Sequence, residues 1–242
     1  MERDDFLKAL RRTARETKAR FPKDGREWID AISTGRSHAD GRRILTNDAI
    51  YELMCCFAVA AALKGQVQNL QVIQADGEKG FRFPLKPGAK SGFAFFRFEF
   101  GGVSYDLCCG TEIDLGNGEP PEAPDISLQR HSQLRQETDR QCGQPIALWD
   151  AKYHDGTASK TDVQQMNWWC DIFNLPPCRA GDVLSQILPA TFQVSAVITN
   201  APLLRVNRRQ LLKRRFSIVC DFSGSRVGRS PAPSRAEHEQ YP

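Results

Sequence analysis

The segment PIALWDAKY, residues 145–153, joins an apolar strand pattern to two opposite charges, and it constrains the fold more than any other part of the chain. Its branched and aromatic residues favour a β-strand. Side chains alternate between the two faces of a strand, so Asp150 and Lys152 are expected on one face, which Ile146 and Leu148 continue. Burying these charges costs several kcal/mol unless they are paired or bind a metal. The opposite face is expected to carry Trp149, Ala151 and Tyr153.

The remaining segments predict an α/β fold with a mixed sheet and helices on its faces. A buried helix is expected to begin at Thr46 or Asn47, either of which can cap it, and to end near Gly65. Gly101 and Gly102 are expected to form a turn between two strands. Residues 76–92 are expected to be a loop, and residues 131–144 a polar stretch with no obvious core residue except Leu134. Further strands are expected at residues 69–75, 93–100, 103–109, 125–129, 192–199 and 216–222, and helices at residues 161–173 and 207–214.

The 242-residue chain is expected to form one domain with appendages. The domain is predicted at residues 44–222, with a helical N-terminal appendage at 1–43 and a disordered tail at 223–242, where Gly, Ser, Pro and Arg dominate. The charged N-terminus does not have the pattern of a secretory signal, and the longest uncharged run, residues 53–63, is too short to span a bilayer. A cytoplasmic protein without a membrane partner is therefore expected. The eight cysteines form no CxxC pair, which argues against a zinc site.

A second acidic residue, Asp125, follows Pro124 at the start of the strand that precedes Asp150. The carboxylates of Asp125 and Asp150 and the backbone carbonyl of Ala151 are oxygen donors of the kind that Mg²⁺ or Mn²⁺ prefers. Lys152 would orient the nucleophile or help to deprotonate it. These residues therefore predict a metal-dependent phosphodiester-cleaving site. The alternative is a structural salt bridge between Asp150 and Lys152, with Asp125 as a simple cap after Pro124.

Together, Pro124-Asp125 and Asp150-Ala151-Lys152 resemble the PD-(D/E)xK motif of restriction-endonuclease-like nucleases. The segment IALWDAKYHDG, followed by VQQMNWW, is most similar to bacterial defence and modification-dependent restriction nucleases, and the resemblance extends from about residue 46 to 222. It implies a restriction-endonuclease-like mixed sheet and a Mg²⁺-dependent deoxyribonuclease that cuts DNA internally in antiviral defence or restriction. The resemblance allows a homodimer. Because the chain has no GxxxxGK[ST] motif, an ATPase, helicase or sensor protein would be a separate partner.

The resemblance also implies catalytic roles for Glu52 and Gln165. Members of the family often place a Glu from the first core helix near the metals, and Glu52 stands at the matching position. Its alternative role is that of an ordinary acid on a helix surface. Gln165 matches the Gln that a QxxxY motif places beside the catalytic Lys, with Trp169 where that motif has Tyr.

A late basic segment is expected to bind nucleic-acid phosphates without reading bases, through Arg208, Arg209 and Lys213. Its alternative role is a solvated helix face. His131 and His154 lie close to the motif segments, and a histidine near an acid can be a general base, but surface positions in polar loops are expected for both. Two other functions stay open: an RNA-cleaving toxin that uses the same site, and a catalytically silent module that binds nucleic acid or a partner protein.

Overall fold

The computed structural model describes the central part of the chain and a few positions before it. The described residues are 8, 12, 36–37, 43–44, 46–63, 67–73, 87–115, 118–131, 141–142, 144–154, 160–175, 182–201, 216–220 and 222. Most of the predicted N-terminal appendage, the predicted basic helix at residues 207–214 and the predicted tail at residues 223–242 lie outside the described residues.

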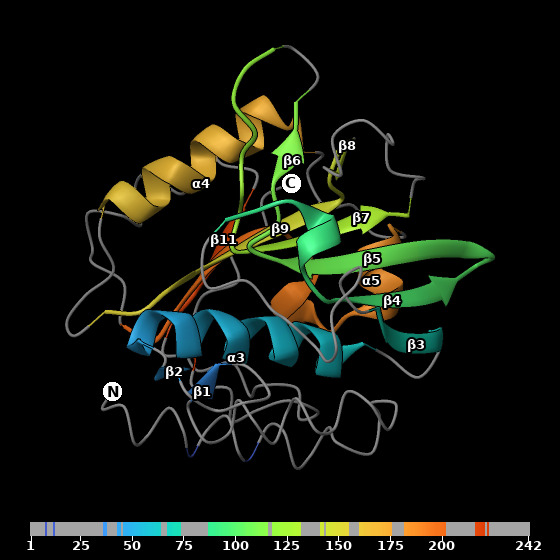
Figure 1. Cartoon of the computed structure of the whole chain (residues 1–242), viewed down its shortest axis with the longest axis horizontal. Coiled ribbons are helices and arrows are strands. Elements are labelled where there is room, and N and C mark those ends of the chain that lie inside the picture. Colours follow the sequence, from blue (N-terminus) through green and yellow to red (C-terminus); the bar gives the residue numbers. More distant parts are fainter. Residues whose placement is uncertain are drawn as a thin grey trace.

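A mixed seven-stranded sheet forms the centre of an α/β fold (Figure 1). The strand order is β11-β10-β9-β7-β5-β4-β3. Strands β11, β10 and β9 run parallel to one another, whereas β7, β5, β4 and β3 each run antiparallel to the strands beside them, β7 being antiparallel to β9. The sheet therefore changes from antiparallel to parallel at β9. The bounds are Gln68–Ile73 for β3, Phe95–Phe100 for β4, Val103–Cys109 for β5, Ile126–Arg130 for β7, Ala147–Lys152 for β9, Ala196–Thr199 for β10 and Ser217–Val219 for β11.

Helix α3, Asn47–Ala62, covers one face of the sheet. Thr46 caps it, because its Oγ1 accepts a hydrogen bond of 3.2 Å from the N–H of Ala49, as the sequence predicts. From Ile50 to Ala61 every side chain except that of Glu52 is buried, so α3 packs both on the sheet and beneath other chain segments. Phe57 meets Phe96 of β4 edge to face, with 5.2 Å between ring centroids.

Helix α4, Lys160–Ile172, covers the opposite face (Figure 1). Its buried side chains include Val163 and Met166, which pack with Leu148 of β9 and Val197 of β10. Ala147, Trp149 and Ala151 of β9 belong instead to the core beneath α3. The predicted alternation along β9 is therefore confirmed, except at one position. Ile146 packs on the α3 side, because it precedes the first residue of the strand.

The predicted strand at residues 192–199 is wrong in its first half. Residues Ala190–Phe192 form a short 3-10 helix, η3, and β10 begins only at Ala196. The side chain of Gln193 holds this turn, because its Nε2 donates to the carbonyl oxygen of Leu188 at 2.9 Å. The buried side chain of Phe192 packs in the core while its backbone stays outside the sheet.

Several short elements were not expected from the sequence. They include helix α5, Val183–Ile187, and a 3-10 turn η2, Lys90–Gly92, at the end of the predicted loop. Strand β6, Ile113–Asp114, pairs with β8, Gln141–Cys142, so a short strand lies within the predicted polar stretch at residues 131–144. Strands β1, Arg36–Ser37, and β2, Arg43–Ile44, form a separate pair. Among the described helices, none has the length and apolar character needed to cross a bilayer.

Candidate active site

Two acidic side chains from adjacent strands form the centre of the candidate site. Asp125 immediately precedes β7, and Asp150 lies within β9. The two strands are antiparallel, and Ile126 pairs with Trp149. The next step of this ladder brings Asp125 opposite Asp150, and directly opposite residues project from the same face of a sheet. The fold therefore brings together two acids that are far apart in the sequence.

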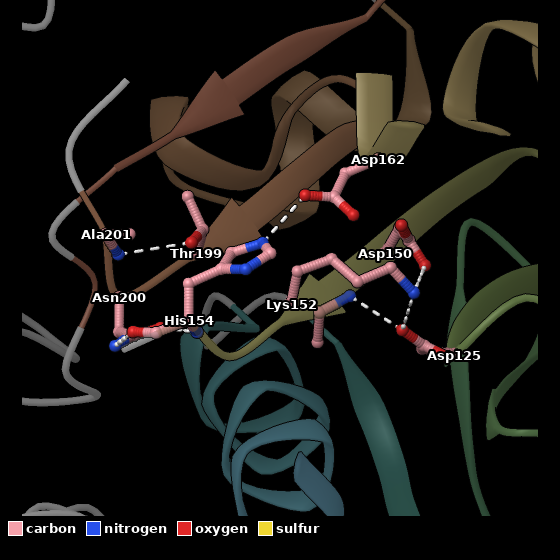
Figure 2. Close-up of polar contacts among 9 residues, drawn as sticks. Asp125, Asp150, Lys152, His154, Asp162, Thr199, Asn200 and Ala201 are labelled. Carbon is pink, nitrogen blue, oxygen red and sulfur yellow. Dashed lines mark hydrogen bonds and ion pairs between the residues drawn. The ribbon is translucent and has the colours of Figure 1, made fainter. Parts of the chain in front are cut away.

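Lys152 and the backbone of Ala151 connect these two acids (Figure 2). Lys152 Nζ lies 2.8 Å from Asp150 Oδ1 and 3.4 Å from Asp125 Oδ2. The backbone N–H of Ala151 donates a hydrogen bond of 2.9 Å to Asp125 Oδ2. Asp125, Asp150, Ala151 and Lys152 are thus neighbours in the structure. The predicted use of the Ala151 carbonyl as a metal ligand stays a prediction, whereas its N–H has a clear partner.

Asp150 is completely buried, and its carboxylate is poorly compensated. Oδ1 has the Lys152 ammonium nearby, but neither carboxylate oxygen accepts a hydrogen bond with good geometry from a described group. Burial, and then the negative charge of Asp125, raise the pKa of Asp150 well above its usual value, and Lys152 only partly opposes this. An ionised Asp150 therefore needs more positive charge than Lys152 provides.

Lys152 is held as an ammonium group. Although burial favours the neutral amine, the adjacent carboxylates of Asp125 and Asp150 outweigh it and raise the pKa of Lys152 above its usual value. A protonated amine donates hydrogen bonds but has no lone pair with which to accept a proton. Of the two roles predicted for Lys152, this charge state favours orientation of the nucleophile over deprotonation.

Glu52 belongs to the same electrostatic environment. Burial, and then the charge of Asp125, raise its pKa to about 8, while Lys152 opposes the shift. Neighbouring Tyr51 connects this part of α3 to the end of β9, since its ring centroid lies 6.4 Å from that of Tyr153. Glu52 is thus not an ordinary surface acid. Among the described residues, however, no three His, Cys, Asp or Glu side chains come close enough together to form a metal-binding group.

Gln165 is not brought into contact with these residues. Its side chain lies on the exposed face of α4, whereas Asp162 and Met166 lie on the buried face. Trp169 is buried as well, and its Nε1 donates to Glu122 Oε2 at 3.2 Å. A role for Gln165 stays a prediction. The predicted phosphate-binding residues Arg208, Arg209 and Lys213 lie outside the described residues.

A histidine that was expected to be a surface residue has a defined place beside the site. His154 Nε2 lies 2.7 Å from Asp162 Oδ2 of α4. The backbone N–H of His154 donates to Asn200 Oδ1 at 2.8 Å, and its carbonyl oxygen accepts from Asn200 Nδ2 at 2.8 Å (Figure 2). The sequence hint was the alternation Asp150, Lys152, His154, but Asp162 and Asn200 become visible as partners only in the fold.

His131, the other histidine near the motif, belongs to a separate polar cluster. The buried carboxylate of Asp106 binds Lys90 Nζ at 2.6 Å, Arg97 Nε at 2.7 Å and His131 Nδ1 at 3.0 Å. Although burial raises the pKa of Asp106, hydrogen bonds and charge from Arg97 and Lys90 outweigh it and lower this pKa below its usual value. Unlike Asp150, Asp106 is fully compensated, so this cluster has the character of a structural ion-pair network.

No known family, curated protein or solved structure matches this chain.

Proposed function

We propose that this protein is a metal-dependent nuclease that hydrolyses phosphodiester bonds of DNA, with Asp125, Asp150 and Lys152 at its catalytic centre. The observation that carries the proposal is that the buried carboxylate of Asp150 is only partly compensated by Lys152. This buried carboxylate shares the single ammonium of Lys152 with Asp125, and Glu52 adds a third acid to the same environment. A divalent cation would favour the ionised forms of these acids and is the natural complement of their combined negative charge.

The donor set fits Mg²⁺ or Mn²⁺. Mg²⁺ is commonly held by one or two carboxylates, with water and substrate phosphate oxygens as its remaining ligands. Asp125 and Asp150 provide two such carboxylates on one face of the sheet, so a cluster of three protein ligands is not required. Bound there, the ion would supply charge stabilisation for the phosphoryl group under attack.

The chain's own groups have separable parts in this reaction. The N–H of Ala151 fixes the Asp125 carboxylate, because it donates to Oδ2. The Lys152 ammonium lies between the two acids, where it can donate hydrogen bonds to the attacking water or to a phosphate oxygen. The pKa of Glu52, about 8, leaves this acid largely protonated at neutral pH. A cation bound nearby would favour its ionised form, so its charge would change when the cation binds.

The surroundings of the motif support the proposal. Asp150 and Lys152 lie in a central strand, Asp125 begins the adjacent strand, and helix α4 follows with the parallel strands β10 and β11. This is the context on which the resemblance to PD-(D/E)xK nucleases rests. DNA as the substrate, a role in antiviral defence or restriction, and an ATPase, helicase or sensor partner follow from that resemblance alone, and the experiment below distinguishes DNA from RNA.

The test is cleavage of supercoiled plasmid, linear duplex DNA, single-stranded DNA and RNA by the full chain, with Mg²⁺, Mn²⁺ or EDTA. Asp150→Asn removes the charge at nearly constant volume. Asp171→Asn is the matched control, since Asp171 is exposed on α4. Metal-dependent cleavage of DNA by wild type and control is expected, with a loss of at least about 100-fold in Asp150→Asn.

Three outcomes would contradict the proposal or part of it. Cleavage of RNA alone would favour the toxin alternative on the same site. Wild-type rates in Asp150→Asn would place the chemistry elsewhere. No cleavage of any substrate with either metal would leave a nucleic-acid- or partner-binding module as the better account of the fold.

A further inference from the structure

We propose that His154 is the general base of this site and that Asp162 is its positioning residue, an inference that rests on the proposed phosphodiester hydrolysis. Neither residue is one of the motif positions Asp125, Asp150 and Lys152, although His154 follows them within the segment IALWDAKYHDG. The two lie on different elements, since His154 follows β9 and Asp162 belongs to α4, and an imidazole nitrogen and a carboxylate oxygen approach to 2.7 Å.

His154 leaves the chain on the same face as Asp150 and Lys152. Tyr153, between Lys152 and His154, packs against the core beneath α3. His154 instead contacts α4, which covers the face that carries Leu148. Alternate residues of an extended chain are about 6–7 Å apart, so His154 is the next side chain along this face after Lys152. A water molecule bound beside Lys152 would therefore lie near the His154 ring, and a catalytic base can act on its target directly or through one further water.

The backbone of His154 is fixed although it lies beyond the last residue of β9. Lys152 pairs with Thr199 in the final step of the ladder between β9 and β10. Asn200, the next residue of that chain, then donates to the carbonyl oxygen of His154 and accepts from its N–H, each at 2.8 Å. These two hydrogen bonds fix the backbone of His154 and so limit the positions that its ring can take. Precise placement of this kind is what a proton-transfer group needs.

The contact with Asp162 selects one form of the neutral ring. Asp162 is nearly buried, and its carboxylate oxygen accepts a hydrogen bond from the Nε2–H of His154. The lone pair is then on Nδ1, for which no hydrogen bond to another described residue is found. A carboxylate placed in this way orients the imidazole and stabilises the imidazolium that forms when the ring takes up a proton.

His154 can act as this base beside Lys152, which already contacts both acids of the site. The Lys152 ammonium is held between Asp150 and Asp125, at 2.8 Å and 3.4 Å. In the proposed step, the oxygen of a water molecule attacks phosphorus while Nδ1 of His154 accepts a proton from that water. The bond from phosphorus to the leaving oxygen breaks, this oxygen keeps the electron pair, and it takes a proton from solvent. His154 then returns its proton to solvent.

The experiment compares His154→Gly and Asp162→Asn with wild type on DNA and on a nitrophenyl phosphodiester, whose leaving group needs no proton. Asp171→Asn and His131→Ala are the controls. A general base acts on the nucleophile, so a loss of about 100-fold or more is expected on both substrates. Added imidazole is expected to restore part of the rate of His154→Gly and to leave that of His131→Ala unchanged.

A second measurement does not depend on activity. Nitrogen NMR of the histidine rings is expected to find neutral His154 protonated on Nε2, and Asp162→Asn is expected to shift the proton towards Nδ1.

Four results would overturn the inference. Neutral His154 protonated on Nδ1 in the wild type would exclude it whatever the activity. Wild-type rates in His154→Gly would do the same. A loss confined to DNA would make His154 a proton donor to the leaving oxygen instead. Cleavage of neither substrate by the wild type would remove the proposed function, and this inference with it.

Discussion

The backbone N–H of Ala151 donates a hydrogen bond of 2.9 Å to the carboxylate of Asp125. The middle residue of the DAK segment therefore contributes through its main chain, while its side chain packs in the core beneath α3. Asp125 is held in register with Asp150 by the same strand that carries Asp150. The geometry of the two acids is thus a property of one pair of strands, β7 and β9.

This hydrogen bond can be isolated by comparing two substitutions of Asp125. Asp125→Asn and Asp125→Ala both remove the negative charge, but only the amide oxygen of Asn can still accept from Ala151. We expect Asp125→Ala to be less stable than Asp125→Asn by about 1–3 kcal/mol, the usual cost of an unsatisfied buried donor. Urea denaturation measures the difference. Equal stabilities would mean that the N–H of Ala151 finds another acceptor.

Asp150→Asn is expected to stabilise the metal-free protein while it abolishes cleavage. Because burial and Asp125 raise the pKa of Asp150 in the folded state, folding favours its protonated form. The associated stability is present below the ordinary pKa of an aspartate and is lost as the pH rises towards the folded-state pKa. With EDTA at about pH 8, Asp150→Asn should therefore gain roughly 0.5–2 kcal/mol over wild type. Thermal denaturation tests this.

The same comparison at lower pH is an internal control. Because the pKa of Asp150 is raised, more of this carboxyl is protonated at about pH 5 than at about pH 8, so the advantage of Asp150→Asn should shrink. A variant that is less stable than wild type at both pH values would show that the carboxylate is compensated after all.

Glu52 is expected to link metal binding to proton release. Its pKa of about 8 leaves it mostly protonated at pH 7, and a nearby cation favours the ionised form. Calorimetric titration with Mn²⁺ in buffers of different ionisation enthalpy should find protons released by the wild type and about one fewer in Glu52→Gln. Glu119→Gln, at an exposed position, is the control. Equal proton release from all three proteins would show that the ionisation of Glu52 does not respond to the bound cation.

Asp106 is expected to stabilise the fold without taking part in the chemistry. Lys90, which is 2% exposed, would be left as a buried unpaired charge in Asp106→Ala, so a loss of about 3–5 kcal/mol is expected. The double variant Lys90→Met, Asp106→Leu should recover part of this loss. Denaturant titration gives both values, and additive losses would argue against the pairing.

The pH dependence of Asp106 has the opposite sign to that of Asp150. Its pKa is lowered in the folded state, so its contribution to stability is present above the ordinary aspartate pKa and is lost as the pH falls through the folded-state value.

Local signals in the sequence predicted much of the fold. The cap at Thr46, the glycine turn before Val103 and the alternation along β9 depend on near neighbours in the chain, and each is confirmed. The predicted start of β10 was wrong. Phe192 continues the apolar pattern of the strand, but the side chain of Gln193 donates a hydrogen bond to the carbonyl oxygen of Leu188, and the chain turns there. A run of apolar residues alone does not distinguish these conformations.

The candidate site was predictable to the extent that strand alternation determines it. Asp150 and Lys152 share a face because they are two residues apart, and Asp125 joins them through the pairing of adjacent strands. The pairing of His154 with Asp162 was not predictable, because it depends on how α4 packs on the sheet. A polar residue at the end of a strand gives no local sign of such a partner.

The central position of β7, β9 and β10 in the sheet has an evolutionary consequence. Asp125 and Asp150 depend on β7 and β9, and the two hydrogen bonds that fix His154 depend on β10, all in the middle of the sheet. The outer strands β3 and β11 contribute no residue to this group. If the proposed function is correct, descendants of this chain are free to diversify the borders of the sheet, while selection acts on the inner strands β7, β9 and β10 and on the two helices that carry Glu52 and Asp162.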